Sequence, residues 1–162
     1  MSSKEYKKII LQKLADNLHL KGFKKNDSNF MLATDDLTYY LSLQSSQSST
    51  SSILTITVNT EIASSAITKV DEISTPIKDQ RHYTRRIGAY FTNPVDIWWT
   101  INNIESAEVA ASEIISLLEK HVLPNFYSLK TTEDLANLWL SNSGYIGITE
   151  GQRKHYLNLL GY

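Results

Sequence analysis

The pattern that most constrains the fold is an alternation of apolar and polar residues that recurs between residues 29 and 101. It is clearest in segments 37–45 and 53–62, where apolar residues occupy nearly every second position. Successive side chains of a β-strand point to opposite faces of its sheet, so this period predicts strands with one face in the core. A short strand is also expected at 29–34. We therefore predict an antiparallel meander of four to five strands.

The segment 81–101 is rich in aromatic residues and also holds three arginines and a histidine. Its Asn93-Pro94 dipeptide is typical of a turn, and the alternation continues on both sides of that dipeptide. This pattern predicts a β-hairpin. On its first arm, His82, Arg86 and Tyr90 follow one another at intervals of four residues and therefore share one face.

Apolar residues recur every three to four positions at both ends of the chain, and this period predicts helices. Residues 3–20 form one amphipathic helix, and the strongest helical pattern lies within 103–123, where Pro124 is expected to end it. Shorter helices are expected after Thr131 and after Thr149. The chain is therefore expected to be an α+β domain with N-terminal and C-terminal helices packed on one face of the sheet.

A chain of 162 residues is expected to form one domain. We expect a sheet-and-helix core at 1–130 and a C-terminal helical extension at 131–162. Segment 63–80 has no dominant period and is expected to be a long surface connection with one helical turn. The serine-rich segment 45–52 is expected to be a flexible hairpin loop, and the alternative is a mobile loop that becomes ordered over a ligand.

The composition excludes several classes of function. The chain has no cysteine, and none of its four histidines forms an i, i+4 pair or an HExxH motif. It contains no GxSxG, GxGxxG or P-loop motif either. We therefore expect no catalytic residue, no metal and no cofactor, and a non-enzymatic role is favoured over an enzymatic one.

The charge balance bears on partners and location. Sixteen basic residues against seventeen acidic ones give a net charge of −1, which argues against nucleic-acid binding and against electrostatic attachment to a membrane. The N-terminus lacks the apolar core of a signal peptide, and no apolar run approaches the ~18 residues of a membrane span. We expect a cytoplasmic protein, and the sequence does not determine its oligomeric state.

Several motifs, taken in order, resemble a bacterial family catalogued as domain of unknown function 4304. The resemblance covers roughly residues 5–140. It implies no activity or site residue that can be transferred, although some families of this size and kind are immunity partners in toxin systems. The motifs are Lys21-Gly22-Phe23-Lys24-Lys25, Leu43-Gln44-Ser45-Ser46, Arg85-Arg86-Ile87-Gly88, Trp98-Trp99, Leu123-Pro124 and Thr132-Glu133-Asp134-Leu135.

One face of the predicted sheet emerges as the candidate binding surface. Exposed aromatic residues beside arginine are enriched at protein interfaces, although a solvated sheet face is the plain alternative. The alternation places Trp99 in the core and Trp98 on the open face, and a slip of one residue would exchange them. Arg85 falls on the apolar side of its strand, where a charge is costly unless it is paired. The candidate binding residues are Tyr40, Gln44, His82, Arg85, Arg86, Tyr90 and Trp98.

These patterns favour a protein–protein interaction module with a protein partner, including an immunity-type inhibitor of a toxin. The alternative is a small ligand-binding or enzymatic domain with an anionic-ligand pocket near Arg86 and His82. The predicted core consists of Leu14, Leu41, Ile56, Val58, Ile87, Trp99, Ile114 and Leu118.

Overall fold

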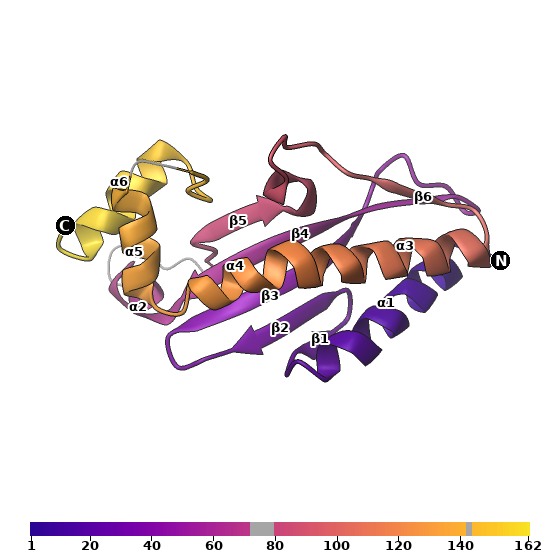
Figure 1. Cartoon of the computed structure of the whole chain (residues 1–162), viewed down its shortest axis with the longest axis horizontal. Helices are drawn as coiled ribbons and strands as arrows, with labels where there is room; N and C mark the ends of the chain where they lie inside the picture. Colours follow the sequence, from indigo (N-terminus) through magenta and orange to yellow (C-terminus); the bar gives the residue numbers. More distant parts are fainter. Residues whose placement is uncertain (72–79, 142–143) are drawn as a thin grey trace.

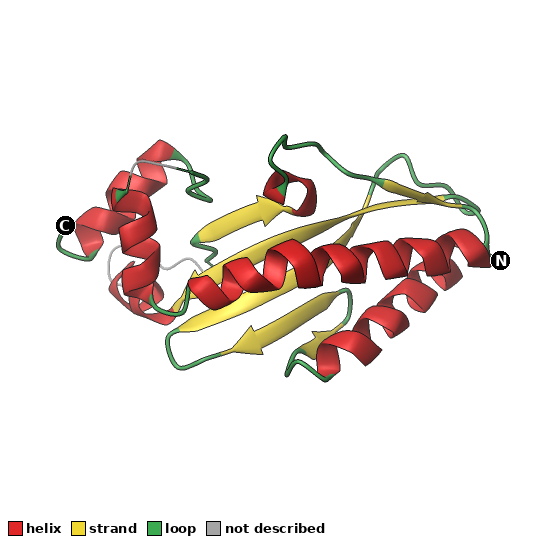
Figure 2. Ribbon diagram, viewed as in Figure 1, coloured by secondary structure: helices red, strands yellow, loops and turns green. Residues whose placement is uncertain are grey.

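The computed structural model describes residues 1–71, 80–141 and 144–162. Within these ranges an antiparallel six-stranded sheet carries helices on one face (Figures 1 and 2), which confirms the predicted α+β class. The strands follow one another as a meander, and the last strand returns to pair with β4. They are β1 (Lys24–Asn26), β2 (Asn29–Ala33), β3 (Leu37–Ser45), β4 (Leu54–Ser64), β5 (Tyr83–Arg86) and β6 (Trp99–Ile101).

The hairpin of β3 and β4 is the centre of the sheet. Its register runs from Leu37 opposite Ser64 to Ser45 opposite Ile56, as the alternation of both segments predicts. The serine-rich segment forms the hairpin loop, in which the backbone N–H of Ser46 donates to the carbonyl oxygen of Thr55 over 2.8 Å. The N–H of Ser3 also donates to the carbonyl oxygen of Ser51 over 2.9 Å, so the loop is tied to the start of the first helix.

The predicted hairpin of residues 81–101 is wrong. β5 and β6 do not pair with each other, because each pairs with a different part of β4. The chain between them forms a 3-10 helix, η1 (Ile87–Tyr90), and then an irregular loop over residues 91–98. The 11-residue β4 has backbone groups to satisfy along its whole length, and two short strands satisfy more of them than a hairpin docked on one part of β4 would.

Two helices cover one face of the sheet. They are α1 (Ser3–His19) and α3 (Ile104–Leu117), and Figure 1 shows both on the same side of the sheet, in front of the strands. The side chain of Ser2 caps α1 by accepting the N–H of Glu5, and Asn103 caps α3 in the same way. Each helix buries one apolar stripe, so the spacing of apolar residues in the sequence correctly predicts which side of each helix is buried.

The expectation that Pro124 ends the long helix is wrong. α3 continues through one π-helical stretch, η2 (Leu118–Val122), into α4 (Leu123–Ser128). Pro124 lies in the first turn of α4, where a backbone N–H needs no partner within the helix.

The remaining helices gather at one end of the molecule (Figure 1). They are α2 (Ser65–Asp71), α5 (Thr132–Leu140) and α6 (Glu150–Leu159). Of the connection expected at 63–80, residues 65–71 form α2, and residues 72–79 lie outside the described ranges. Residues 145–147 lie against the outer edge of β5, where the N–H of Thr84 donates to the carbonyl oxygen of Gly147 over 2.7 Å.

The core lies between the sheet and the helices α1 and α3. Seven of the eight predicted core residues are buried, and Trp99 is half-buried against the core. Among the residues that the structure describes, no helix is both long and apolar enough to cross a membrane.

Candidate functional site

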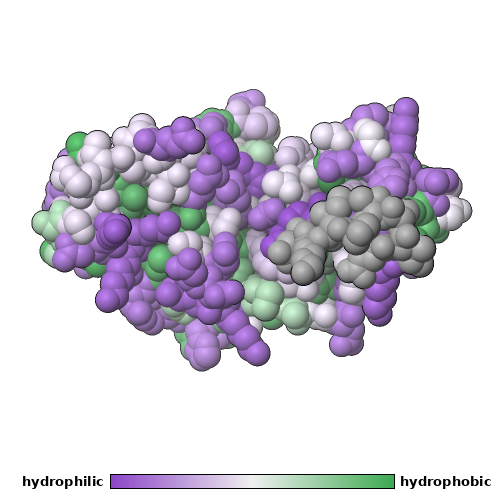
Figure 3. Space-filling model, turned by 180° about the vertical axis from the view of Figure 1, so that it is seen from behind, coloured by the Kyte–Doolittle hydropathy of each residue, from purple (hydrophilic) through white to green (hydrophobic). Residues whose placement is uncertain are grey.

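Among the residues that the structure describes, no layer of helices covers the sheet face opposite α1 and α3, here called the open face. Figure 3 shows the molecule from that side, and its visible surface is mainly hydrophilic. Because Ile56, Val58 and Ile62 of β4 are buried toward the helices, the residues of opposite parity, Thr57, Asn59 and Glu61, point to the open face. The pairing of Asn59 with Arg86 brings β5 side chains onto the same face.

Five side chains from β3, β4, β5 and the loop over 91–98 form a continuous group on the open face, here called the Trp98 cluster. The indole N–H of Trp98 donates to Asp96 Oδ2 over 3.0 Å, and Arg86 Nη1 donates to both oxygens of Asp96 over 2.9 and 3.0 Å. The guanidinium carbon of Arg86 lies 5.3 Å from the Trp98 ring centroid. Asn59 accepts from Arg86 Nε over 3.4 Å and donates to Gln44 over 2.7 Å.

The Trp98 cluster is exposed, and its members hold each other in place. The side chains of Arg86 and Asp96 are 38% and 55% exposed, and Trp98 is half-buried. The hydrogen bonds from Trp98 and Arg86 lower the pKa of Asp96, so this carboxylate stays ionised at neutral pH. Arg86 and Asp96 also neutralise each other, and the cluster therefore presents an indole, two amides and an ion pair to solvent.

Tyr40 also lies on the open face, as predicted. The Arg81 guanidinium stacks on the Tyr40 ring, with 3.7 Å between the guanidinium carbon and the ring centroid. Arg81 Nε lies 3.8 Å from a carboxylate oxygen of Glu61, the residue that pairs with Tyr40 across the sheet. This second group on the same face was not predicted, because Arg81 precedes β5 and the alternation gives no direction for its side chain.

The assignment of His82 to the open face is wrong. His82 is fully buried: the N–H of Ser64 donates to its Nδ1 over 2.8 Å, and its Nε2 lies 2.9 Å from Gln80 Oε1. Burial lowers the pKa of His82 to about 4. The ring is therefore neutral and structural, and it cannot line the surface pocket with Arg86 that the sequence suggested.

Tyr90 does not share the face of Arg86 either. The 3-10 helix η1 breaks the period of two after Arg86, and the Tyr90 hydroxyl lies 2.8 Å from that of Thr60, whose side chain is buried. Burial raises the pKa of Tyr90 well above its ordinary value. The guanidinium of Arg85 stacks at 4.0 Å on Tyr90 and at 4.7 Å on Tyr145. Arg85 thus occupies the apolar side of its strand, as predicted, and its charge is held between aromatic rings.

The described residues offer little for metal or acid–base chemistry. No group of three or more His, Asp or Glu side chains within these residues could hold a metal ion. A buried polar chain links His82 through Gln80 to Asp71, and Asp71 lies 3.0 Å from His155 Nε2. This chain joins the segment just before β5 to α2 and α6, and it therefore helps to hold the helical end of the molecule in place.

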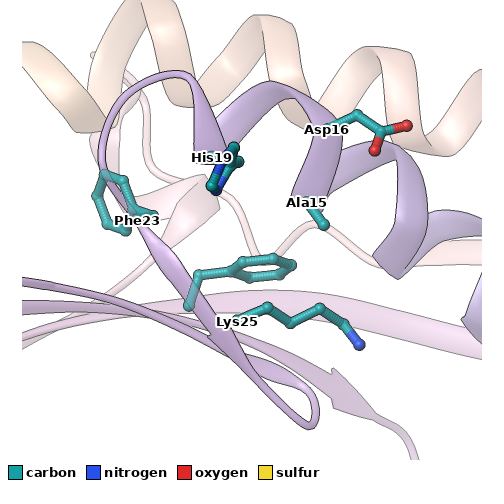
Figure 4. A pocket seen from close by; sticks show the side chains of 6 residues that line it. Ala15, Asp16, His19, Phe23 and Lys25 are labelled. Carbon is teal, nitrogen blue, oxygen red and sulfur yellow. The ribbon is translucent and has the colours of Figure 1, made fainter.

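A hollow of about 330 Å³ lies on the opposite side of the molecule, beside the C-terminal end of α1 (Figure 4). Its polar side chains are Asp16, His19 and Lys25, and these three make no hydrogen bond with one another. Asp16 instead accepts from Gln12 over 2.9 Å on the same helix. The hollow therefore lacks the convergent polar groups of a ligand site.

Gly88→Ala is expected to lower the free energy of unfolding by about 1–3 kcal/mol or more. A Cβ at Gly88 would lie 1.7 Å from the carbonyl oxygen of Val95, so the loop that carries Asp96 and Trp98 would have to move. Urea unfolding measures this loss. Gly151→Ala is the matched control, because no atom lies within 4 Å of its added Cβ, and unchanged or slightly raised stability is expected. An equally small effect at Gly88 would contradict the observed packing of the loop.

The comparisons with known proteins give one match. The family model described as "Domain of unknown function (DUF4304)" matches residues 14–128, a range that includes all six described strands and the whole Trp98 cluster. Helices α5 and α6 lie beyond the matched range. No curated protein and no solved structure matches the chain.

Proposed function

Because the chain belongs to the DUF4304 family, whose description carries no activity, we propose from its surface that it is a cytoplasmic protein–protein interaction module. In this proposal the open face binds a partner protein, and the Trp98 cluster makes the central contact. The observation that carries the proposal is the exposed, hydrogen-bonded arrangement of Trp98, Arg86 and Asp96.

The residue types in the cluster support this proposal. Tryptophan and arginine are the residues most enriched among those that dominate binding energy at interfaces. A side chain that is fixed before binding loses less conformational entropy when the complex forms. Trp98 and Arg86 are fixed in this way through their shared bonds to Asp96.

The charge of the cluster indicates the chemistry of the partner. Arg86 is neutralised by Asp96 at 2.9 Å, so the cluster has no net charge with which to attract a strongly charged surface. The half-buried indole of Trp98 and the amides of Asn59 and Gln44 fit a partner surface that combines apolar side chains with hydrogen-bonding groups. Binding through this cluster is therefore expected to depend only weakly on salt concentration.

Trp98→Ala and Arg86→Ala are each expected to weaken binding to the partner by about tenfold or more, as truncation of a central interface residue does. The partner is first identified by pull-down with the wild-type protein, and its affinity is then measured by calorimetry. Tyr127→Ala is the matched control. Tyr127 is 46% exposed on α4, on the helical side of the molecule, and its removal is expected to leave binding unchanged.

Thermal unfolding of the same variants separates binding from folding. Arg86→Ala removes an exposed ion pair and is expected to lower the free energy of unfolding by about 1 kcal/mol or less. Full affinity in both Trp98→Ala and Arg86→Ala would contradict the proposal and leave the open face as a solvated surface.

The more specific form of the proposal is an immunity-type role, in which the open face covers a toxin. It is supported by analogy with other families of small proteins and by the exposed cluster. Co-expression with the product of a neighbouring toxin gene tests it: wild-type protein is expected to restore growth, and Trp98→Ala to restore it less. Equal rescue by Trp98→Ala would contradict this form.

A further inference from the structure

A second feature of the open face is a hollow of about 420 Å³ between β3 and α2, at the end of the sheet away from Trp98. Thr38 and Tyr40 of β3 line it on one side, Ser65 and Lys69 of α2 line it on another, and Arg81 borders it. An adjoining hollow of about 500 Å³ also has Arg81 in its lining. Both volumes lie in the range of small-ligand sites, and Arg81 is the residue that they share.

The guanidinium of Arg81 is fixed in position but has unused donors. Its stacking on Tyr40 at 3.7 Å sets the plane of the group. Nη1 donates to the carbonyl oxygen of Gln80 over 3.3 Å, whereas Nε is buried without a hydrogen bond, because Glu61 at 3.8 Å is too distant for one. Nη2 donates to none of the described residues. A guanidinium with free donors in a fixed plane is suited to bind a planar oxyanion.

The charges around the hollow favour a singly charged anion. Lys69 is exposed and forms no ion pair with any carboxylate of the described residues. Arg81 and Lys69 against Glu61 leave one net positive charge among these three residues, two positive and one negative. The carboxylate of Asp71 accepts from Gln80 of the lining, but it is buried and also lies 3.0 Å from His155. A carboxylate balances this charge, whereas a phosphate monoester carries about −1.5 to −2 at neutral pH and would leave an excess beside Glu61.

We infer that Arg81 and Lys69 form a binding site for a carboxylate group, such as an Asp or Glu side chain of a peptide. In this site Arg81 Nη2 donates to the carboxylate and Lys69 approaches it from α2. The site and the Trp98 cluster share no residue: Arg81 lies beside Glu61, whereas Arg86 pairs with Asn59 and bonds to Asp96, so each can be changed separately.

A titration of the ¹⁵N-labelled full chain followed by NMR tests this inference. The probes are a capped tripeptide Gly-Glu-Gly, its Gly-Gln-Gly counterpart, sodium acetate and inorganic phosphate. The Glu peptide is expected to shift the amide signals of Tyr40, Ala63 and Lys69 saturably, and the Gln peptide is expected to leave them unchanged. Tighter binding of the Glu peptide than of acetate identifies a peptide side chain as the ligand, and equal binding identifies a small carboxylic acid.

Lys69→Gln is the decisive variant, because Lys69 is exposed and its change is expected to leave the fold intact. It is expected to weaken binding of the Glu peptide by about fivefold, the effect of one partly exposed charge. Arg81→Gln is expected to abolish binding. Lys120→Gln, an exposed lysine of η2 on the helical side, is the matched control and is expected to bind as the wild type does.

Three results would overturn the carboxylate site. They are equal binding of the Glu and Gln peptides, wild-type affinity in Lys69→Gln, and tighter binding of phosphate than of the Glu peptide. Trp98→Ala is expected to bind the Glu peptide normally, so failure of the carboxylate site and failure of the proposed partner surface are separate results.

Discussion

Leu118→Ala is expected to lower the free energy of unfolding by about 2–5 kcal/mol, the range for a large-to-small change in a core. Leu118 is 2% exposed and stands where α3 passes into η2. It borders a void of about 10 Å³ together with Leu14, Leu41 and Val58. The truncation enlarges a space that already exists, and the sheet and the helices on both sides restrict its collapse.

Urea unfolding monitored by circular dichroism measures this loss. Val109→Ala is the matched control on the same helix, because Val109 is 50% exposed and its truncation is expected to change stability by less than about 0.5 kcal/mol. A loss below about 1 kcal/mol for Leu118→Ala would show that the long helix contributes much less to the core than its burial indicates.

Acidification from pH 7 to pH 5 is expected to lower the free energy of unfolding by about 2 kcal/mol through His82 alone. His82 is held neutral in the fold, because the N–H of Ser64 occupies its Nδ1 and burial opposes a charge. Asp71 favours the charged form and Arg81 opposes it, and burial outweighs both.

The direction of the pH effect follows from the two pKa values. In the unfolded chain His82 takes up a proton as the pH falls through about 6.5, whereas in the fold it does so only near pH 4. The unfolded state therefore binds more protons between these values. The contribution of the neutral His82 ring to the free energy of unfolding is complete above about pH 6.5. Below that pH it decreases by about 1.4 kcal/mol for each pH unit, until about pH 4.

Denaturation at a series of pH values, with wild type and His82→Gln compared, tests this effect. The variant is expected to show a flatter profile between pH 7 and pH 5, while His19→Gln, at an exposed position, keeps the wild-type profile. If His82→Gln does not fold, an NMR titration of the His82 imidazole signal in the wild type tests the prediction instead. A titration midpoint near 6.5 for that signal would contradict the buried, neutral ring.

Much of the fold was predictable, because in the long strands and helices the spacing of apolar residues in the sequence matches the pattern of buried side chains. Every second residue of β3 from Leu37 to Leu43 is buried, and the Ala107 to Ile114 stripe of α3 is buried as its spacing predicts. In these segments local geometry and the hydrophobic pattern favour the same structure, so the sequence alone identifies both the element and its inner face.

The segment 81–101 could not be predicted, because tertiary contacts override its alternation. Gly88 allows the backbone at Val95 to approach closely, and β4 offers pairing sites to both β5 and β6. Neither contact can be inferred from the alternation of apolar and polar residues within segment 81–101. The Asn93-Pro94 dipeptide lies within the irregular loop over residues 91–98, and the strands on its two sides pair with β4 instead of with each other.

The candidate site was predicted in part for the same reason. Arg86 and Trp98 lie together on the open face, because each is adjacent in sequence to a residue that faces the core. Tyr90 was misplaced once the chain entered η1, and His82 because it precedes the regular part of β5. Asp96, which joins Arg86 to Trp98, lies in an irregular loop and has no period that could have identified it.

Site-specific photo-crosslinking tests most directly whether the open face is the partner-binding surface. Benzoylphenylalanine is introduced at Thr100, which is exposed and lies on the open face beside Trp98, or at Val109 on the outer side of α3. The partner identified by pull-down is expected to crosslink to position 100 and not to position 109. Crosslinking at position 109 without crosslinking at position 100 would contradict the proposed surface and place the partner on the helices.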